Sequence, residues 1–246
     1  MKIEEQIRAL ESFARSSSKT ARRSFFAALA HKSSKVRWAA AVLLADTHDK
    51  RTVPRIARLL RDVNREVRYF AAESLGILLG KTGKAPSALF RLLRDKDSLV
   101  RVQALDTFSE ICDKRYLPSI SKLVLDEDPL VRMHAAGCIA DLRGKRYKKL
   151  LRIQWAKEHD PSAEIGILLA LCCFGDWNLF ERLLGKLTSN NYRVRCAAAN
   201  CLDGLNLRPK VRRMALSSLM RARRHAIGKA DIEAVNRTIR SLRLTL

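Results

Sequence analysis

The residues that could do chemistry in this 246-residue sequence do not form a known catalytic or metal-binding pattern. No two of the five histidines lie three or four residues apart, the spacing that places two imidazoles on one face of a helix. Glycine-rich phosphate loops and Gly-x-Ser-x-Gly motifs are also absent. The histidines are His31, His48, His134, His159 and His225. We therefore predict that the protein is not an enzyme, and we expect no catalytic residue, metal or cofactor.

The cysteines support the same expectation. No Cys-x-x-Cys pair is present, and most of the six cysteines fall on the apolar side of predicted helices. They are Cys112, Cys138, Cys172, Cys173, Cys196 and Cys201. We expect reduced thiols that pack in the core.

One phrase recurs along the chain, most clearly as "DPLVRMHAAGCIADL" (128–142). A polar residue is followed three and four positions later by Val-Arg, and then by alanines and a large apolar residue. Copies anchored on the valine position lie at Val36, Val67, Val100, Val131, Ala163 and Val194. Their spacings of 31, 33, 31, 32 and 31 residues predict stacked structural repeats.

Each anchor is predicted to lie in the first turn of a helix, here called the B helix. A short polar residue stands three positions before each anchor, where it can cap the helix: Ser33, Asn64, Asp97, Asp128, Asp160 and Asn191. Pro129 and Pro161 then occupy the first helical position. Residues four, five and eight positions after the anchor, such as Ala135, Ala136 and Ile139, form the buried face.

An earlier helix, the A helix, is expected to cover this face in each unit. The predicted A helices span residues 53–61, 85–94, 117–125, 147–155 and 178–187. Helical hairpins that cannot each bury a face must stack. We predict an all-α, right-handed α-solenoid of about six two-helix repeats, with an N-terminal capping helix in residues 1–19, repeats in 20–206 and basic capping helices in 207–246.

The repeated string resembles a known family. From Asp49 to Gly76 the sequence is similar to the HEAT-like repeats of the phycobilin lyase (PBS lyase) type, and the resemblance covers residues 20–206. It implies that arginines after the anchors (Arg37, Arg68, Arg101, Arg132, Arg195) pair with acids of neighbouring turns (Asp62, Asp95, Asp126, Glu158). The fifth copy departs from the pattern, with Glu164 in place of the arginine.

Two enzymatic alternatives follow from resemblance. Phycobilin lyase subunits share these repeats, but the shared fold supplies no catalytic residue to transfer to this sequence. HEAT-like alkylpurine DNA glycosylases place an Asp beside tryptophans, and Asp106 is the matching candidate here. Its surroundings, "VQALDTFSE", lack those tryptophans, so an exposed, non-catalytic Asp106 is favoured.

An apolar column and a cationic stripe are the candidate binding surfaces. The column lies two residues after each anchor and faces away from the core; it contains Trp38, Tyr69, Val102, Met133 and Ile165. We expect these residues to contact a partner. The alternative is that neighbouring B helices bury them against each other. The cationic stripe lies on a terminal helix and contains Arg213, Arg221 and Arg224, which are predicted to bind anions. The formal net charge of +23 is concentrated towards the chain ends.

These surfaces predict a non-enzymatic scaffold that binds an acidic or amphipathic protein along a concave groove. The alternative is a nucleic-acid protein that contacts the phosphate backbone through its basic surface. The apolar stretch from Ile165 to Phe174 is too short to span a membrane, and a cytoplasmic protein is expected. The oligomeric state and the identity of the partner are left open.

Overall fold

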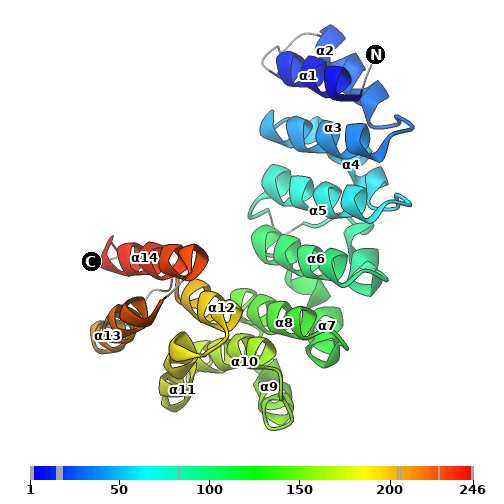
Figure 1. Ribbon diagram of the computed structural model, residues 1–246. Coiled ribbons are helices and arrows are strands. Elements are labelled where there is room, and N and C mark those ends of the chain that lie inside the picture. Colours follow the sequence, from blue (N-terminus) through cyan, green and yellow to red (C-terminus); the bar gives the residue numbers. More distant parts are fainter. Residues whose placement is uncertain are drawn as a thin grey trace. The chain divides into compact units, whose positions relative to one another are not determined.

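The protein is built from α-helices and short 3-10 helices (Figure 1). A computed structural model describes residues 3–14, 19–82, 84–203, 205, 207–226 and 228–244. Within these residues no strand is present, and no helix is both long enough and apolar enough to cross a bilayer. The chain divides into two compact units, Met1–Leu123 (unit 1) and Val124–Leu246 (unit 2).

Unit 1 is a stack of B helices flanked by shorter A segments. Its B helices are α3 (Ser34–Asp46), α5 (Arg65–Leu79) and α6 (Ser98–Ile111). Helix α3 packs against α5, and α5 packs against α6. The remaining elements are α1 (Ile3–Ala14), α2 (Lys19–Ala28), η1 (Lys50–Thr52), α4 (Val53–Leu59), η2 (Leu89–Arg94), η3 (Lys114–Tyr116) and α7 (Leu117–Ile120). The 3-10 helix η4 (Ser121–Leu125) spans the unit boundary.

Unit 2 continues the same pattern and ends in a helical pair. Its B helices are α8 (Pro129–Asp141), α10 (Pro161–Cys173) and α12 (Tyr192–Leu202), and the terminal helix α14 packs on α12. The other elements are η5 (Lys145–Tyr147), α9 (Lys148–Trp155), η6 (Trp177–Leu179), α11 (Phe180–Gly185), η7 (Lys186–Thr188), α13 (Pro209–His225) and α14 (Lys229–Leu244).

The predicted B helices and their buried faces are confirmed. Ala71, Ala72 and Leu75 on α5 are fully buried, as are Ala135 and Ala136 on α8. Small side chains at these positions let the neighbouring helices approach closely, and the large apolar residue one turn later fills the remaining space. The predicted N-terminal helix is also present as α1.

Some A helices differ from the prediction. Residues 85–94 contain only the 3-10 helix η2, and residues 117–125 divide into α7 and η4. Buried Leu89 and Leu92 lie three residues apart, which places both on one side of a three-residue turn. Burial of this leucine pair therefore needs no full α-helix.

Five of the six predicted helix caps form side-chain hydrogen bonds. Asp128, for example, accepts from the backbone N–H of Leu130 at 2.8 Å. The exception is Ser33, which makes no side-chain cap; its own N–H donates to Nδ1 of His31 at 3.0 Å.

The predicted pairing of arginines with acids of the next repeat is confirmed for Arg37, Arg68 and Arg132. Arg68 donates to both carboxylate oxygens of Asp95 at 2.6 and 2.7 Å, and to the carbonyl of Asp62 at 2.8 Å. The same arrangement joins Arg37 to Asp62 and Arg132 to Glu158, and Arg195 binds Asp231 of the terminal helix α14. Each arginine thus ties its own A–B turn to the following repeat. We call these pairs the ladder.

The fifth copy carries the ladder with its charges reversed. Glu164 accepts from Nε of Arg182 at 2.6 Å and also pairs with Lys186, both of which follow it in the chain. The bulky residues of this copy do not form a surface patch, because Ile167 and Leu168 are fully buried.

Candidate functional site

The first candidate surface is the outward side of the B helices in unit 1, called here the α3–α5–α6 face. Trp38, Tyr69 and Val102 lie on it, one from each helix, and all three are half-buried. The ring of Trp38 stacks on Phe70 with centroids 4.7 Å apart, and Tyr69 meets the same ring edge-on at 5.3 Å. The aromatic side chains are therefore fixed by neighbours and only partly covered.

Carboxylates lie near Tyr69 on this face. Burial raises the pKa of the Tyr69 phenol, and the nearby charges of Glu73 and Asp106 raise it further. Desolvation also raises the pKa of Glu110, with Asp106 and Glu73 adding repulsion. Gly76 on α5 leaves the space in which the Glu110 carboxylate lies. The α3–α5–α6 face is thus apolar and acidic in a protein whose formal net charge is +23.

The predicted contact column is interrupted in unit 2. Met133 is half-buried, whereas Ile165 is 0% exposed, so its predicted role in partner contact is wrong. The cause is the packing of Ile165 in a core cluster with Leu183 of α11 and Val194 of the neighbouring B helix α12. The alternative of mutual burial between neighbouring B helices therefore holds for that residue. The backbones of α8 and α10 also approach closely, since a Cβ on Gly166 would lie 2.8 Å from the Cα of Met133.

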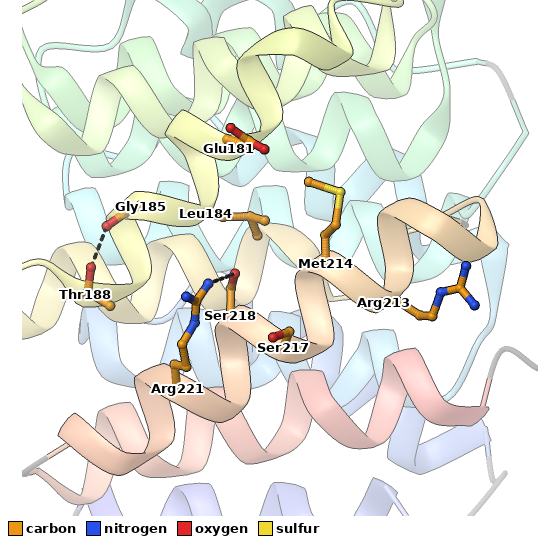
Figure 2. A pocket seen from close by; sticks show the side chains of 9 residues that line it. All are labelled: Glu181, Leu184, Gly185, Thr188, Arg213, Met214, Ser217, Ser218 and Arg221. Atoms are coloured by element: carbon orange, nitrogen blue, oxygen red, sulfur yellow. Dashed lines mark hydrogen bonds between the residues drawn. The ribbon is translucent and has the colours of Figure 1, made fainter.

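The second candidate is a cleft in unit 2 between α11, η7 and α13, called here the terminal cleft. Its volume is about 710 Å³. Figure 2 shows the side chains that line it, with Met214 reaching from α13 towards α11 and Leu184 on the opposite wall. The lining residues are Glu181, Leu184, Gly185, Thr188, Arg213, Met214, Ser217, Ser218 and Arg221.

Two of the three arginines predicted to bind anions line this cleft. Arg213 and Arg221 lie towards opposite ends of the lined stretch (Figure 2), and both are exposed. Arg221 donates to the hydroxyl of Ser218 at 3.2 Å. Among the residues that the structure describes, no carboxylate pairs with Arg213 or Arg221. Arg224 is exposed on the same helix but does not line the cleft.

Sequence reasoning missed the rest of the cleft. The apolar residues Leu184 and Met214 and the hydroxyls of Thr188 and Ser218 come from helices that do not share a repeat column. The one available signal was Ser217, a small polar residue that interrupts the arginine stripe of α13. The depth of the cleft depends on how α13 docks, which periodicity does not specify.

The cysteines are free, as expected, but only some are core residues. Cys138 and Cys172 are buried, whereas Cys173 is exposed. Burial raises the pKa of the Cys172 thiol to about 12, so this side chain remains protonated and unreactive at neutral pH.

Comparison with known proteins agrees with the repeat architecture. A family model described as HEAT repeats matches residues 3–76, 22–105 and 85–172. Protein YibA of Escherichia coli (strain K12) is 35% identical over 86 residues, which are 35% of this chain and 31% of that protein. The same match is found with Protein YibA of Escherichia coli O157:H7. This chain therefore matches about a third of the curated relative's length.

Two solved structures are similar in fold. The complex of CpcE and CpcF of phycocyanin lyase from Nostoc sp. PCC7120 gives a TM-score of 0.64 at 18% identity, covering 89% of this chain and 94% of that chain. The X-ray structure of the E. coli YibA protein gives a TM-score of 0.51 at 16% identity, covering 99% and 98%. Together with the repeat columns, the caps and the ladder, the family match shows that this chain belongs to the HEAT-repeat family.

Proposed function

We propose that this protein is a non-catalytic scaffold that binds an amphipathic segment of a partner protein on the α3–α5–α6 face. The observation that carries the proposal is the pair Trp38 and Tyr69, held by Phe70 and only half-buried. Rigid aromatic side chains that keep part of their surface exposed are frequent anchors of protein interfaces.

The charge of the face specifies the partner further. Glu73, Asp106 and Glu110 would repel an acidic segment, and they would attract a segment whose apolar side is flanked by Lys or Arg. Of the two partner classes expected from the sequence, acidic and amphipathic, the second therefore fits this face.

The pairing of the ladder residues with each other supports a non-catalytic role. The repeated arginines and acids, which would otherwise be candidates for chemistry, bind each other in buried pairs such as Arg68–Asp95. The free cysteines are consistent with a reducing compartment, and we place the protein in the cytoplasm as part of the same proposal.

Quantitative affinity capture from the native cell, with nuclease treatment, tests the scaffold proposal. The test variant is Trp38→Ala with Tyr69→Ala, and the matched control is Trp177→Ala with Tyr192→Ala, which removes exposed aromatics of the same types from unit 2. We expect specific partners to be lost with the test variant and kept with the control. An identical partner list for wild type and test variant, with circular dichroism showing both folded, would refute the proposal.

A second candidate function is binding to the phosphate backbone of nucleic acid. It is favoured by the net charge and by the exposed arginines Arg213, Arg221 and Arg224 on α13. Retention of duplex and single-stranded DNA and RNA at about 50 and 200 mM salt tests it, because phosphate-driven binding weakens by orders of magnitude over that range. Reversal of the three arginines to Glu should abolish such binding if this function is correct.

A further inference from the structure

The terminal cleft combines three features that its position in the fold does not require. It has cationic side chains towards both ends, an apolar wall between them formed by Leu184 and Met214, and hydroxyl groups along its length. Arg213 and Arg221 have no carboxylate partner among the described residues, in contrast to the ladder arginines. Their charge is therefore available to a ligand.

The spacing of the arginines sets the length of a matching ligand. Arg221 follows Arg213 by eight positions on α13, so their Cα atoms lie about 12 Å apart at 1.5 Å per residue. An extended peptide advances about 3.3 Å per residue and points alternate side chains to one face. Its residues i and i+4 are therefore about 13 Å apart and face the same way, with residue i+2 between them.

We propose that the terminal cleft binds an extended acidic peptide of the form acid-x-apolar-x-acid. The two carboxylates pair with Arg213 and Arg221, and the central apolar side chain packs against Leu184 and Met214. This site is separate from the α3–α5–α6 face, and the chemistry of its ligand is opposite in charge.

The lining of the cleft favours a peptide over a nucleic acid. A single-stranded nucleic acid is bound by stacking of its bases on aromatic rings, and none of the lining residues is aromatic. Glu181 on the α11 wall can accept hydrogen bonds from the backbone N–H groups of a peptide, whereas the sugar-phosphate backbone of a nucleic acid has no N–H group to donate. The mixed polarity of the cleft therefore suits a ligand that carries both donors and acids.

Fluorescence anisotropy of the full chain with labelled peptides tests the proposal. The probe has the central sequence Glu-Ser-Leu-Ser-Glu, and the comparison peptides replace both Glu by Lys, or Leu by Ser. We expect saturable binding of the probe at about 50 mM salt, weaker binding when Leu is replaced, and none with Lys. Absence of saturable binding up to a peptide concentration of about 1 mM, which marks the weak end of specific affinities, would overturn the proposal.

Paired variants locate the binding site. Arg213→Ala with Arg221→Ala should weaken probe binding at least about tenfold, the effect of losing one charged hydrogen bond. The control, Lys210→Ala with Arg223→Ala, removes the same charge from exposed positions of α13 outside the cleft and should change binding less than twofold. Equal losses in both variants, or tighter binding of a single-stranded DNA of the same charge, would show charge attraction without this site and would also overturn the proposal.

Discussion

At the scale of single residues, the ladder separates arginines that hold the fold from arginines that are free to bind. Arg68 is one of the buried charged residues, and its side chain is 8% exposed, like that of its partner Asp95. Arg65, one turn earlier on α5, also pairs with an acid, Asp97, but its side chain is 63% exposed. The two ion pairs therefore differ in burial and not in chemistry.

This difference predicts the effect of removing each arginine. Arg68→Met leaves Asp95 as an uncompensated buried charge and should lower the free energy of unfolding by about 3–5 kcal/mol. Arg65→Met should change it by no more than about 1 kcal/mol, because exposed ion pairs contribute little. Urea unfolding of both variants, followed by circular dichroism, measures the difference. Similar losses for both variants would show that burial does not determine the strength of the ladder.

The ladder also predicts acid sensitivity. Although burial opposes ionisation, hydrogen bonds from Arg132, Asp160 and Gln154 lower the pKa of Glu158 from 4.5 to about 2. A carboxyl whose pKa is lower in the folded state stabilises the fold above its unfolded pKa, and this stabilisation is lost as the pH falls from about 4.5 towards 2. Between pH 7 and pH 3 the loss from this residue should be about 2 kcal/mol.

Glu158→Gln tests this assignment. The variant has no titrating group at this position. The difference in free energy of unfolding between wild type and variant should therefore be about 2 kcal/mol smaller at pH 3 than at pH 7. Urea unfolding at both pH values gives the two differences. A constant difference across this range would show that Glu158 keeps its ordinary pKa in the folded protein.

At the scale of helices, the sequence predicts the elements better than their approach distances. The cap residues and the paired alanines specify where α5 and α8 begin and which side they bury, because both signals are local. The burial of Ile165 was not predictable in this way. It depends on contacts with residues of α11 and α12, which the repeat columns do not specify. The close approach of α10 to the backbone of α8 at Gly166 was not predictable either, because a single glycine in a helix does not reveal what it faces.

Two glycines in unit 2 provide a matched test of this packing. Gly166→Ala would place a Cβ 2.9 Å from the carbonyl carbon of Met133, so we expect destabilisation of about 1–3 kcal/mol from overpacking. Gly137, inside α8, has no neighbouring atom within 4 Å of a built Cβ. Gly137→Ala should instead stabilise the protein by about 0.5–1 kcal/mol through helix propensity. Thermal unfolding of the two variants should therefore shift in opposite directions, and shifts in the same direction would contradict the packing argument.

At the scale of the whole chain, periodicity predicts a single continuous array, whereas the structure has two compact units. The spacing from Val100 to Val131 is an ordinary 31 residues, although the boundary between Leu123 and Val124 lies inside it. A repeat period indicates which residues contact the next repeat, but it contains no information on how strong those contacts are. The terminal cleft was likewise only half predictable, because Arg213 and Arg221 are visible as a stripe but the wall that faces them is not.

The ladder is a property of the chain as a whole, since at least five of the six copies pair with a segment that follows them. Its single reversal, at Glu164, can be read in two ways. The fifth copy is either a degenerate repeat, or a repeat whose partner has changed with it. The structure supports the second interpretation, because Lys186 and Arg182 supply the cations that Glu164 needs.

Charge exchange distinguishes these interpretations. Glu164→Arg restores the residue type found in the other copies, yet it should destabilise the protein by about 3–5 kcal/mol, because it puts a cation in place of a residue that is 7% exposed and pairs with Lys186 and Arg182. Adding Lys186→Glu should recover part of the loss, with a coupling energy of about 0.5–3 kcal/mol in a double-mutant cycle of urea unfolding. If Glu164→Arg were neutral or stabilising, the reversed pair would not be part of the ladder. Additive effects of the two substitutions would lead to the same conclusion, because residues that form one buried ion pair must show coupling.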